Sequence, residues 1–381
     1  MKLYEYEAKR ILTTFGIPTP RGEVAENPAE ARKAADNLKA PFAIKTQVLV
    51  AGRGKAGGIL FVEDTQQVAA AAESLFRMKI RDSPVKSILV EERIPIAREL
   101  YFSVTVDRVE RKYALLASTL GGMDIEEAAT KNAEAVVKTL INLDEGVTDS
   151  SALQIAGRMG YSGRQSARLA SVLVGLWRAG LAYDAELIET NPLVETTNGE
   201  FVAVDARLIV DDNTLFRHPE LEKLRFAEER ENTPSEVEAA RSGLAYVKLD
   251  GDIGLVGNGA GLVMATLDTI QYYGGAPADF LDLGGGAPVE RIAKALEIVL
   301  SDPSVKAVLI NILGGLTHCD DVARAITQIK KAAPTMKPLV VRLVGTNEEE
   351  GRRILIESDV VVLDSMEEAA KHAVEAAEEA R

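Results

Sequence analysis

The spacing of apolar positions divides the chain into two halves with different rhythms. In the first half, apolar residues recur at helical spacing over residues 1–15, 27–38 and 65–76. Short apolar runs typical of strands lie between them, at 42–50, 58–62, 87–90, 99–106, 113–119, 185–189 and 201–205. Two Ala-rich stretches, at about 124–140 and 151–180, predict further helices. Mixed helices, strands and hairpins predict an α+β unit.

The second half alternates strictly between strand and helix. The apolar runs typical of strands lie at 254–256, 280–283, 307–312, 339–343 and 360–363. Glycine follows each of the first four runs. This alternation predicts a five-stranded parallel sheet with helices on both faces, and open sheets of this kind bind ligands at their carboxyl edge.

A highly charged stretch separates the two halves. Residues 218–238 read HPELEKLRFAEERENTPSEVE and contain a Thr-Pro pair. This composition predicts a linker between a domain at 1–217 and a domain at 239–381. A length of 381 residues is ample for two or three domains with their own cores.

The most informative stretch is residues 44–59, which read IKTQVLVAGRGKAGGI. Lys45 stands in the apolar run, and Gly52, Arg53 and Gly54 open the loop. Glycines let the backbone turn tightly and bring N–H groups close to an oxyanion. This local positive charge, in a chain whose net charge is −14, indicates a flap that holds phosphate. A basic hairpin without a ligand is the alternative.

This loop differs from the two common phosphate-binding loops. A Walker loop requires Ser or Thr after the lysine, whereas Ala56 follows Lys55. A dinucleotide-binding fingerprint opens a helix, whereas residues 59–62 are typical of a strand. The pattern therefore predicts a β-hairpin flap over a nucleotide.

Polar residues at the ends of other strands supply candidate ligands. Glu189 and Asn191 follow one strand, and Asp205 ends the next. Oxygens from two adjacent strands can share Mg²⁺ bound to phosphates, although a surface hairpin with a polar tip fits these residues equally well. Glu91 ends a further strand and could accept from a ribose hydroxyl, but an exposed carboxylate at a strand end is the commoner explanation.

The chain offers no persuasive nucleophile of its own. His318 lies at a predicted helix start, where an acid–base or phosphoryl-carrier role is conceivable. Cys319 at a helix N-terminus could have a lowered pKa. A passive structural role is the commoner one for residues of both kinds.

Composition excludes several classes of protein. A pI near 5.0 argues against nucleic acid or an anionic membrane as partner. The sequence contains no apolar run of about 18 residues, so no transmembrane helix is predicted. The charged N-terminus is unlike a signal peptide. A single cysteine fits the reducing cytoplasm, and three scattered histidines argue against a zinc site.

Taken together, the motifs resemble the β subunits of succinyl-CoA synthetase (succinate–CoA ligase) nearly from end to end. The segments that carry the resemblance are KLYEYEAKRIL, VAGRGKAGG, ELIETNPLV, GNGAGLVMATLD, FLDLGGGA and INILGGLTHCD. The resemblance implies an N-terminal ATP-grasp domain, with a flap and lid subdomain at about 21–99, followed by a flavodoxin-like CoA-ligase domain.

The resemblance also implies an activity and a partner. The reaction is the reversible conversion of succinate, CoA and ATP to succinyl-CoA, ADP and phosphate, with Mg²⁺ as cofactor. It runs through an acyl phosphate and through a phosphohistidine on an α subunit, which also binds CoA. ADP or GDP as the nucleotide, and αβ or α₂β₂ as the assembly, both stay open.

Matching the motifs residue by residue implies four sets of site residues. Nucleotide contacts fall on Lys45, Gly52, Arg53, Gly54, Glu91, Ile94 and Glu99. Mg²⁺ ligands fall on Asn191 and Asp205, and Glu189 matches a carboxylate that orients the histidine of the α subunit. The acid and phosphate site falls on Asn258, Gly315, Leu316 and Thr317. The helix that begins near Cys319 matches one whose N-terminus points at the phosphohistidine.

The sequence departs from the family pattern at two places, and alternative functions therefore stay open. The stretch between residues 76 and 88 is shorter than in many bacterial members. Thr317-His318 replaces a more usual aliphatic-then-basic pair, so a malate–CoA ligase β subunit is an alternative. A nucleotide-sensing scaffold without turnover is a third interpretation. Against it stands the presence of four candidate site residues, Lys45, Glu189, Asn191 and Asp205.

Overall fold

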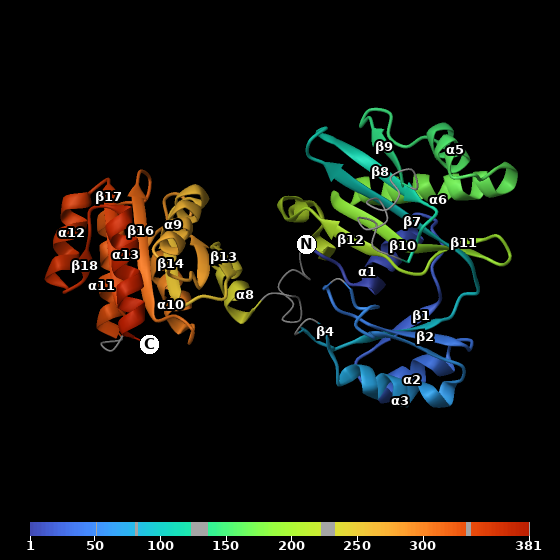
Figure 1. Cartoon of the computed structure of the whole chain (residues 1–381), viewed down its shortest axis with the longest axis horizontal. Coiled ribbons are helices and arrows are strands. Elements are labelled where there is room, and N and C mark those ends of the chain that lie inside the picture. Colours follow the sequence, from blue (N-terminus) through green and yellow to red (C-terminus); the bar gives the residue numbers. More distant parts are fainter. Residues whose placement is uncertain (51, 81–82, 123–135, 222–232, 333–336, 381) are drawn as a thin grey trace. The chain divides into compact units, whose positions relative to one another are not determined.

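The computed structural model describes residues 1–50, 52–80, 83–122, 136–221, 233–332 and 337–380. The chain forms two compact units, Met1–Glu231 and Asn232–Arg381, which are described here one at a time (Figure 1). No helix in the described ranges is long and apolar enough to cross a membrane.

The first unit contains a small antiparallel sheet covered by two helices. Its strand order is β1-β6-β2-β3, with bounds Gly22–Ala25, Ile88–Glu92, Phe42–Thr46 and Ile59–Val62. Helices α2 (Pro28–Asp36) and α3 (Thr65–Phe76) bury Leu75 against Phe42 and Ile44 of β2. A short hairpin follows α3, formed by β4 (Lys79–Ile80) and β5 (Ser83–Pro84). The predicted strand–loop–strand flap is confirmed, because β2 pairs antiparallel with β3.

A larger antiparallel sheet completes the first unit. Its strand order is β11-β10-β7-β8-β9, and β12 also pairs with β10. The bounds are β7 Ile96–Asp107, β8 Lys112–Ser118, β9 Val136–Ile141, β10 Ala185–Thr196, β11 Phe201–Ala203 and β12 Arg207–Val210. The helices of this layer are α1 (Glu5–Thr14), α5 (Asp149–Arg158) and α6 (Gly163–Ala182), and a 3₁₀ helix, η2, spans Asp212–Arg217. Phe102 of β7 and Leu115 of β8 share one core with Leu173 of α6.

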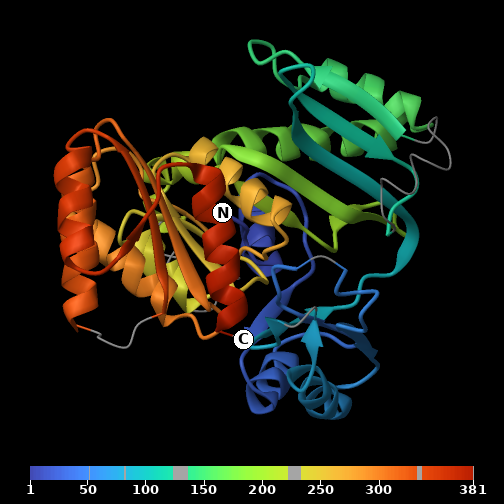
Figure 2. The same cartoon turned by 60° about the vertical axis from the view of Figure 1, so that its left-hand side comes forward.

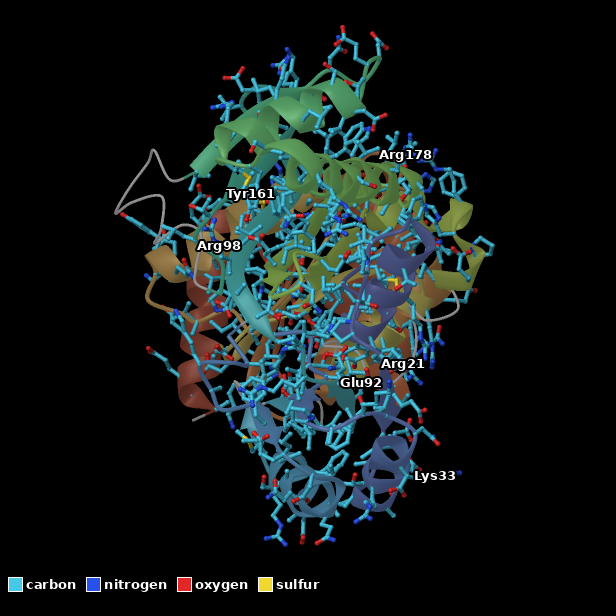
Figure 3. All side chains as sticks on the ribbon, turned by 90° about the vertical axis from the view of Figure 1, so that its right-hand side faces the viewer. Arg21, Lys33, Glu92, Arg98, Tyr161 and Arg178 are labelled. Carbon is cyan, nitrogen blue, oxygen red and sulfur yellow. The ribbon has the colours of Figure 1, made fainter. Side chains whose placement is uncertain are left out.

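Two predicted helices of this unit differ from the structure. The part of the 124–140 prediction that is described, 136–140, lies in strand β9, which pairs with β8; residues 123–135 lie outside the described ranges. The 151–180 stretch is two helices, because the chain turns at Gly160 with φ of +87°. Tyr161, which is labelled in Figure 3, ties this turn to β10 by donating to Glu195 at 2.8 Å. Burial, and after it the hydrogen bond to this carboxylate, raises the pKa of Tyr161 to about 12.

The second unit is an open sheet between two layers of helices (Figure 2). Its strand order is β13-β15-β14-β16-β17-β18, with bounds Ala245–Lys248, Asp279–Asp282, Ile253–Gly257, Ala307–Gly314, Leu339–Gly345 and Val361–Val362. Its helices are α8 Pro234–Arg241, α9 Ala260–Tyr272, α10 Val289–Ser301, α11 Cys319–Ala332, α12 Glu348–Glu357 and α13 Met366–Glu379. The five predicted strands pair in parallel as expected, and β13 adds an unpredicted antiparallel edge.

Alternate residues of the strands face opposite layers. Leu255 and Leu309 lie in the core that contains α9 and α13, whereas Val256 and Ile310 lie in the core that contains α10 and α11. Both faces of the sheet are therefore buried, which explains the continuous apolar runs in the sequence.

The stretch predicted as a linker, 218–238, is ordered at both described ends. His218 is buried, bonds Asp184 at 2.8 Å and stacks on Tyr183. At the other end, Thr233 caps α8 by accepting from the Glu236 backbone at 3.2 Å. Of the polar residues that suggested a linker, His218 is thus buried, and Thr233 and Glu236 form a helix capping box. Residues 222–232 of the same stretch lie outside the described ranges.

One buried carboxyl weakens the second unit. Asp279 begins β15, is 1 % exposed and accepts from the Leu255 backbone N–H at 3.2 Å. Burial raises the pKa of Asp279 well above its usual value. The folded chain therefore binds this proton more tightly than the unfolded chain, and stability falls as pH rises through the interval between the two pKa values.

We expect Asp279→Asn to stabilise the chain at pH 7 by roughly 1 kcal/mol, because the variant has no carboxyl whose pKa is raised by folding and keeps an acceptor for Leu255. The stabilisation should shrink towards pH 4, where wild-type Asp279 is protonated. Urea unfolding midpoints of the full chain across this pH range measure the difference. A constant difference at every pH would contradict the titration of this carboxyl.

Candidate active site

The first unit buries an unusual number of charges where its two sheets meet. The charged cluster consists of Glu5, Lys9, Lys45, Arg53, Glu91 and Asp205. The first two come from α1, Lys45 and Glu91 from β2 and β6, Arg53 from the flap, and Asp205 from the turn between β11 and β12. With three positive and three negative groups, the charged cluster is balanced.

Lys45 has a complete set of acceptors. Its ammonium donates to Glu5 at 3.0 Å and to the backbone oxygen of Val204, and it pairs with Glu91 at 2.8 Å. An ammonium has three N–H donors, so these three acceptors account for all of them.

Arg53 joins the flap to the rest of the unit. Its guanidinium donates to the Thr46 carbonyl and to Asp205, each at 2.9 Å, and pairs with Glu5 at 2.5 Å. The loop can fold this tightly only because Gly58 has no side chain, since a Cβ there would lie 2.6 Å from the Thr46 hydroxyl and 3.0 Å from the Arg53 carbonyl. Gly52 adopts φ of +86°, which favours glycine.

The opposed charges keep most of the cluster ionised. Burial raises the pKa of Glu5, but Arg53, Lys45 and Lys9 outweigh burial and hold it well below its usual value. Burial lowers the pKa of Lys45, but the surrounding carboxylates outweigh it and the net shift is upward. Asp205 differs, because burial raises its pKa by more than Arg53 lowers it. A second cation at Asp205 would therefore be favoured.

A second group of polar residues lies on β10 and β7. Glu189 on β10 accepts from the Tyr101 hydroxyl at 2.9 Å, and Ser103 lies 2.9 Å from the same hydroxyl. Burial, followed by the charge of Glu189, raises the pKa of Tyr101. Tyr101 therefore remains a donor that fixes the Glu189 carboxylate.

Asn191 and Glu99 hold the chain that follows β8. Asn191 accepts from the Gly122 N–H at 2.8 Å, and the Glu99 backbone accepts from the Gly121 N–H at 3.1 Å. Gly121 cannot be replaced freely, because a Cβ there would lie 2.5 Å from the backbone of Leu100, and Gly122 has φ of +72°, which favours glycine. Ile94, another predicted nucleotide contact, is half-buried between β6 and β7.

The two predicted Mg²⁺ ligands fit a hard cation. Thr190, next to Asn191, donates to the Asp205 carbonyl at 2.9 Å, so this hydrogen bond joins the two chain segments. The side chain of Asp205 is 36 % exposed, and burial raises its pKa although Arg53 pairs with it at 2.9 Å. Carboxylate and amide oxygens are the ligands that Mg²⁺ prefers.

In the second unit, the glycine-rich loops meet at the carboxyl edge of the sheet, as predicted. Asn258 after β14 exchanges two hydrogen bonds of 2.9 Å with the Leu313 backbone at the end of β16. Thr317 is 1 % exposed and accepts from the Gly286 N–H at 3.1 Å. Leu316, by contrast, is 81 % exposed, and Gly315 lies between it and the end of β16.

The start of α11 shows the surroundings of His318 and Cys319, the two residues considered for a chemical role. Cys319 is fully buried, and burial raises the pKa of its thiol, so the possibility of a lowered pKa is wrong. His318 is exposed, and its ring lies within 4.8 Å of the Asp320 and Asp321 carboxylates. Both carboxylates already pair with Arg324, at 2.7 and 2.6 Å.

The structure thus brings four predicted residues into the charged cluster, namely Lys45, Arg53, Glu91 and Asp205. Gly52 and Gly54 lie in the flap loop beside it. The sequence interpretation missed four residues that organise the two sites: Glu5, Lys9, Tyr101 and Asp282. Asp282 was detectable, because an acid at a strand end, one residue before a run of glycines, is placed to hold their N–H groups.

Two domain families match this chain. The ATP-grasp domain matches residues 2–195, and the CoA-ligase domain matches residues 256–376. ATP citrate lyase from Methanothrix soehngenii, solved with citrate and coenzyme A, has the same fold with a TM-score of 0.76. At 18 % identity it covers 98 % of this chain, and this chain covers 99 % of that one. The chain is therefore an ATP-grasp protein with a CoA-ligase domain.

Curated relatives narrow this class to one family. The ADP-forming succinate–CoA ligase β subunit of Ignicoccus hospitalis is 47 % identical, with 100 % of both chains covered. That of Roseiflexus sp. is 45 % identical, with 99 % and 100 % covered. A GDP-forming β subunit from Thermus thermophilus is 45 % identical, with 97 % of each chain covered. The chain belongs to the family of succinate–CoA ligase β subunits.

A substitution of Asp282 tests whether this side chain keeps the glycine-rich loops of the second unit ordered. Its Oδ1 accepts from Gly259 N–H at 2.5 Å and from Gly284 N–H at 2.8 Å, so one side chain joins two loops. We expect Asp282→Ala to speed hydrogen exchange at both amides at least about 10-fold and to lower stability by roughly 1–2 kcal/mol. Unchanged hydrogen exchange at Gly259 and Gly284 would show that the structure of the two loops does not depend on Asp282.

Proposed function

We propose that this chain is the nucleotide-handling subunit of an ADP-forming succinate–CoA ligase and works with an α subunit. The balanced charged cluster beneath a glycine-rich flap carries the proposal. Lys45 and Arg53 supply donors for phosphates, and Asp205 with Asn191 would hold Mg²⁺, which neutralises phosphate charge when bound. Gly52, Gly54, Glu91, Ile94 and Glu99 complete the proposed nucleotide site.

The phosphoryl carrier is proposed to lie on the partner. His218 is buried against Asp184, and His372 lies on α13 beside Glu375. His318 belongs to the second unit, where the proposed acid and phosphate site lies. A histidine brought by an α subunit would meet Glu189, whose carboxylate Tyr101 already orients.

The proposed acid is succinate. Asn258, Gly315, Leu316 and Thr317 would line the acid and phosphate site, at the loops that follow parallel strands. The Thr317 oxygen already accepts from Gly286, so its first role is to hold a loop rather than to select a hydroxylated acid such as malate. CoA would be bound mainly by the α subunit. The proposed location of the protein is the cytoplasm.

We expect the purified chain to bind Mg·ATP but to form no CoA thioester alone. Together with its α subunit, it should convert succinate, CoA and ATP to succinyl-CoA. Calorimetry measures the binding, and thioester formation with succinate and malate, each with ATP and GTP, measures the turnover. Thioester formation by the single chain, or a preference for malate, would contradict the proposal.

The same assay tests the proposed metal ligands. Asn191→Ala and Asp205→Ala should each weaken the binding of Mg·ATP more than that of metal-free ATP.

Glu189 should affect only one of the two half-reactions. Glu189→Gln keeps the size of the side chain but removes the charge that holds a histidine ring and stabilises its cation. We expect phosphorylation of the α subunit by ATP to slow by roughly 10²-fold. Phosphorylation of the same histidine from succinyl-CoA and phosphate should change much less. Glu186→Gln, exposed on the same strand, serves as the control. Equal slowing in both directions would refute the role.

A further inference from the structure

Lys9 shares every acceptor of Lys45. The Lys9 ammonium pairs with Glu5 at 2.7 Å and with Glu91 at 2.6 Å, and donates to the Val204 carbonyl at 2.8 Å. These are the same two carboxylates and the same carbonyl that occupy the Lys45 ammonium. Two cations therefore hold one set of acceptors.

This duplication bears on how Lys45 can reach a nucleotide. All three of its N–H donors are engaged, so a phosphate oxygen can replace one of them only if an existing partner is released. The partners are buried, since the side chains of Glu5 and Glu91 are each 2 % exposed. A buried carboxylate left without a cation is strongly unfavourable. Glu5 also pairs with Arg53, whereas the ion pairs of Glu91 in the described ranges are with Lys9 and Lys45, so the release of Lys45 requires Lys9 to remain at Glu91.

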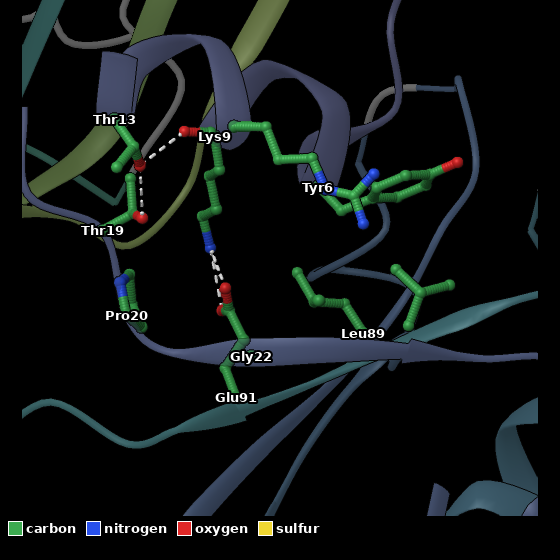
Figure 4. A pocket seen from close by; sticks show the side chains of 10 residues that line it. Tyr6, Lys9, Thr13, Thr19, Pro20, Gly22, Leu89 and Glu91 are labelled. Carbon is green, nitrogen blue, oxygen red and sulfur yellow. Dashed lines mark hydrogen bonds and ion pairs between the residues drawn. The ribbon is translucent and has the colours of Figure 1, made fainter. Parts of the chain in front are cut away.

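Lys9 is the second cation that pairs with both carboxylates. Figure 4 shows its side chain crossing from α1 to Glu91 beside a cavity of about 110 Å³. Thr13 and Glu91 are among the other residues that line the cavity. Lys9 therefore borders this cavity, whereas Lys45 and Arg53 are not among its lining residues.

We propose that Lys9 is a positioning residue that keeps Glu5 and Glu91 paired while Lys45 turns to the nucleotide phosphates. The inference rests on the proposed function, because it takes a nucleotide as the ligand of the flap. Without Lys9 the cluster would carry two cations against three carboxylates. Lys45 would then be held by its own cluster, and the excess negative charge would oppose an anionic ligand.

The test compares Mg·ATP binding by full-length variants. We expect Lys9→Met, which keeps the length of the side chain without its charge, to weaken binding at least about 10-fold. Lys33→Met is the matched control, because Lys33 lies exposed on α2 (Figure 3) and should bind as the wild type does. Lys9→Gln replaces Lys9→Met if the methionine variant fails to fold, and the same loss is expected.

A compensating substitution separates charge balance from a simple structural role. Lys9→Met combined with Glu5→Gln again has equal numbers of positive and negative groups. We expect the double variant to bind Mg·ATP more tightly than Lys9→Met alone, although it lacks one more ion pair. If Lys9 only clamps α1 to β6, the second substitution should add a further loss or change nothing.

The outcomes distinguish this inference from the proposed function. If the wild-type chain fails to bind Mg·ATP, the proposed function itself fails. If the wild type binds and the Lys9 variants bind equally well, only the role of Lys9 is overturned. A double variant that binds no better than Lys9→Met would also overturn it, whereas rescue by Glu5→Gln supports it.

Discussion

The requirement that buried charges be paired governs the architecture of the first unit. Three carboxylates and three cations from α1, both sheets and the flap meet where water is largely excluded. Each charge alone would be strongly unfavourable at its position, and the set is tolerated because every member has opposite charges within hydrogen-bond distance. The relative placement of the small sheet, the large sheet and the N-terminal helix therefore depends on this charged cluster as well as on apolar packing.

The flap depends on the same constraint. A glycine-rich loop has little packing of its own and loses much conformational freedom when it is ordered. Arg53 offsets this cost by reaching Thr46, Glu5 and Asp205, so the loop is held by contacts beneath it. Gly58 allows the close approach that puts Arg53 there. Charge and backbone freedom act together at this point, and neither alone would order the loop.

Most of the fold could be predicted from the sequence, and the failures have physical causes. Helix α3 spans Thr65–Phe76 as expected, and Asp64 caps its first turn. The parallel strands were detected because both their faces are buried. Strand β13 was missed because Ala245-Tyr246-Val247-Lys248 alternates weakly at an edge. Strand β9 was missed because its alternate residues are partly exposed and it follows an Ala-rich stretch.

The candidate site was predicted in part, and the omissions are informative. Glycines and charged residues at strand ends can be recognised locally, because the chain must turn there. Glu5 and Lys9 could not be recognised in this way, since an i, i+4 pair of opposite charges on a helix usually faces solvent. Only the tertiary structure, which brings β2 and β6 against α1, turns this pair inward.

Carboxylates within a proposed anion site require an explanation, and the charged cluster provides one. Three cations without counter-charges would be costly to bury before any ligand arrives, and their pKa values would fall. Glu5 and Glu91 instead keep Lys45 ionised, as the raised pKa of Lys45 indicates. An anionic ligand then exchanges one set of negative partners for another and meets no bare positive charge. The gain on binding is a difference between two paired states, so such a site can both take up a nucleotide and release it, as a reversible reaction requires.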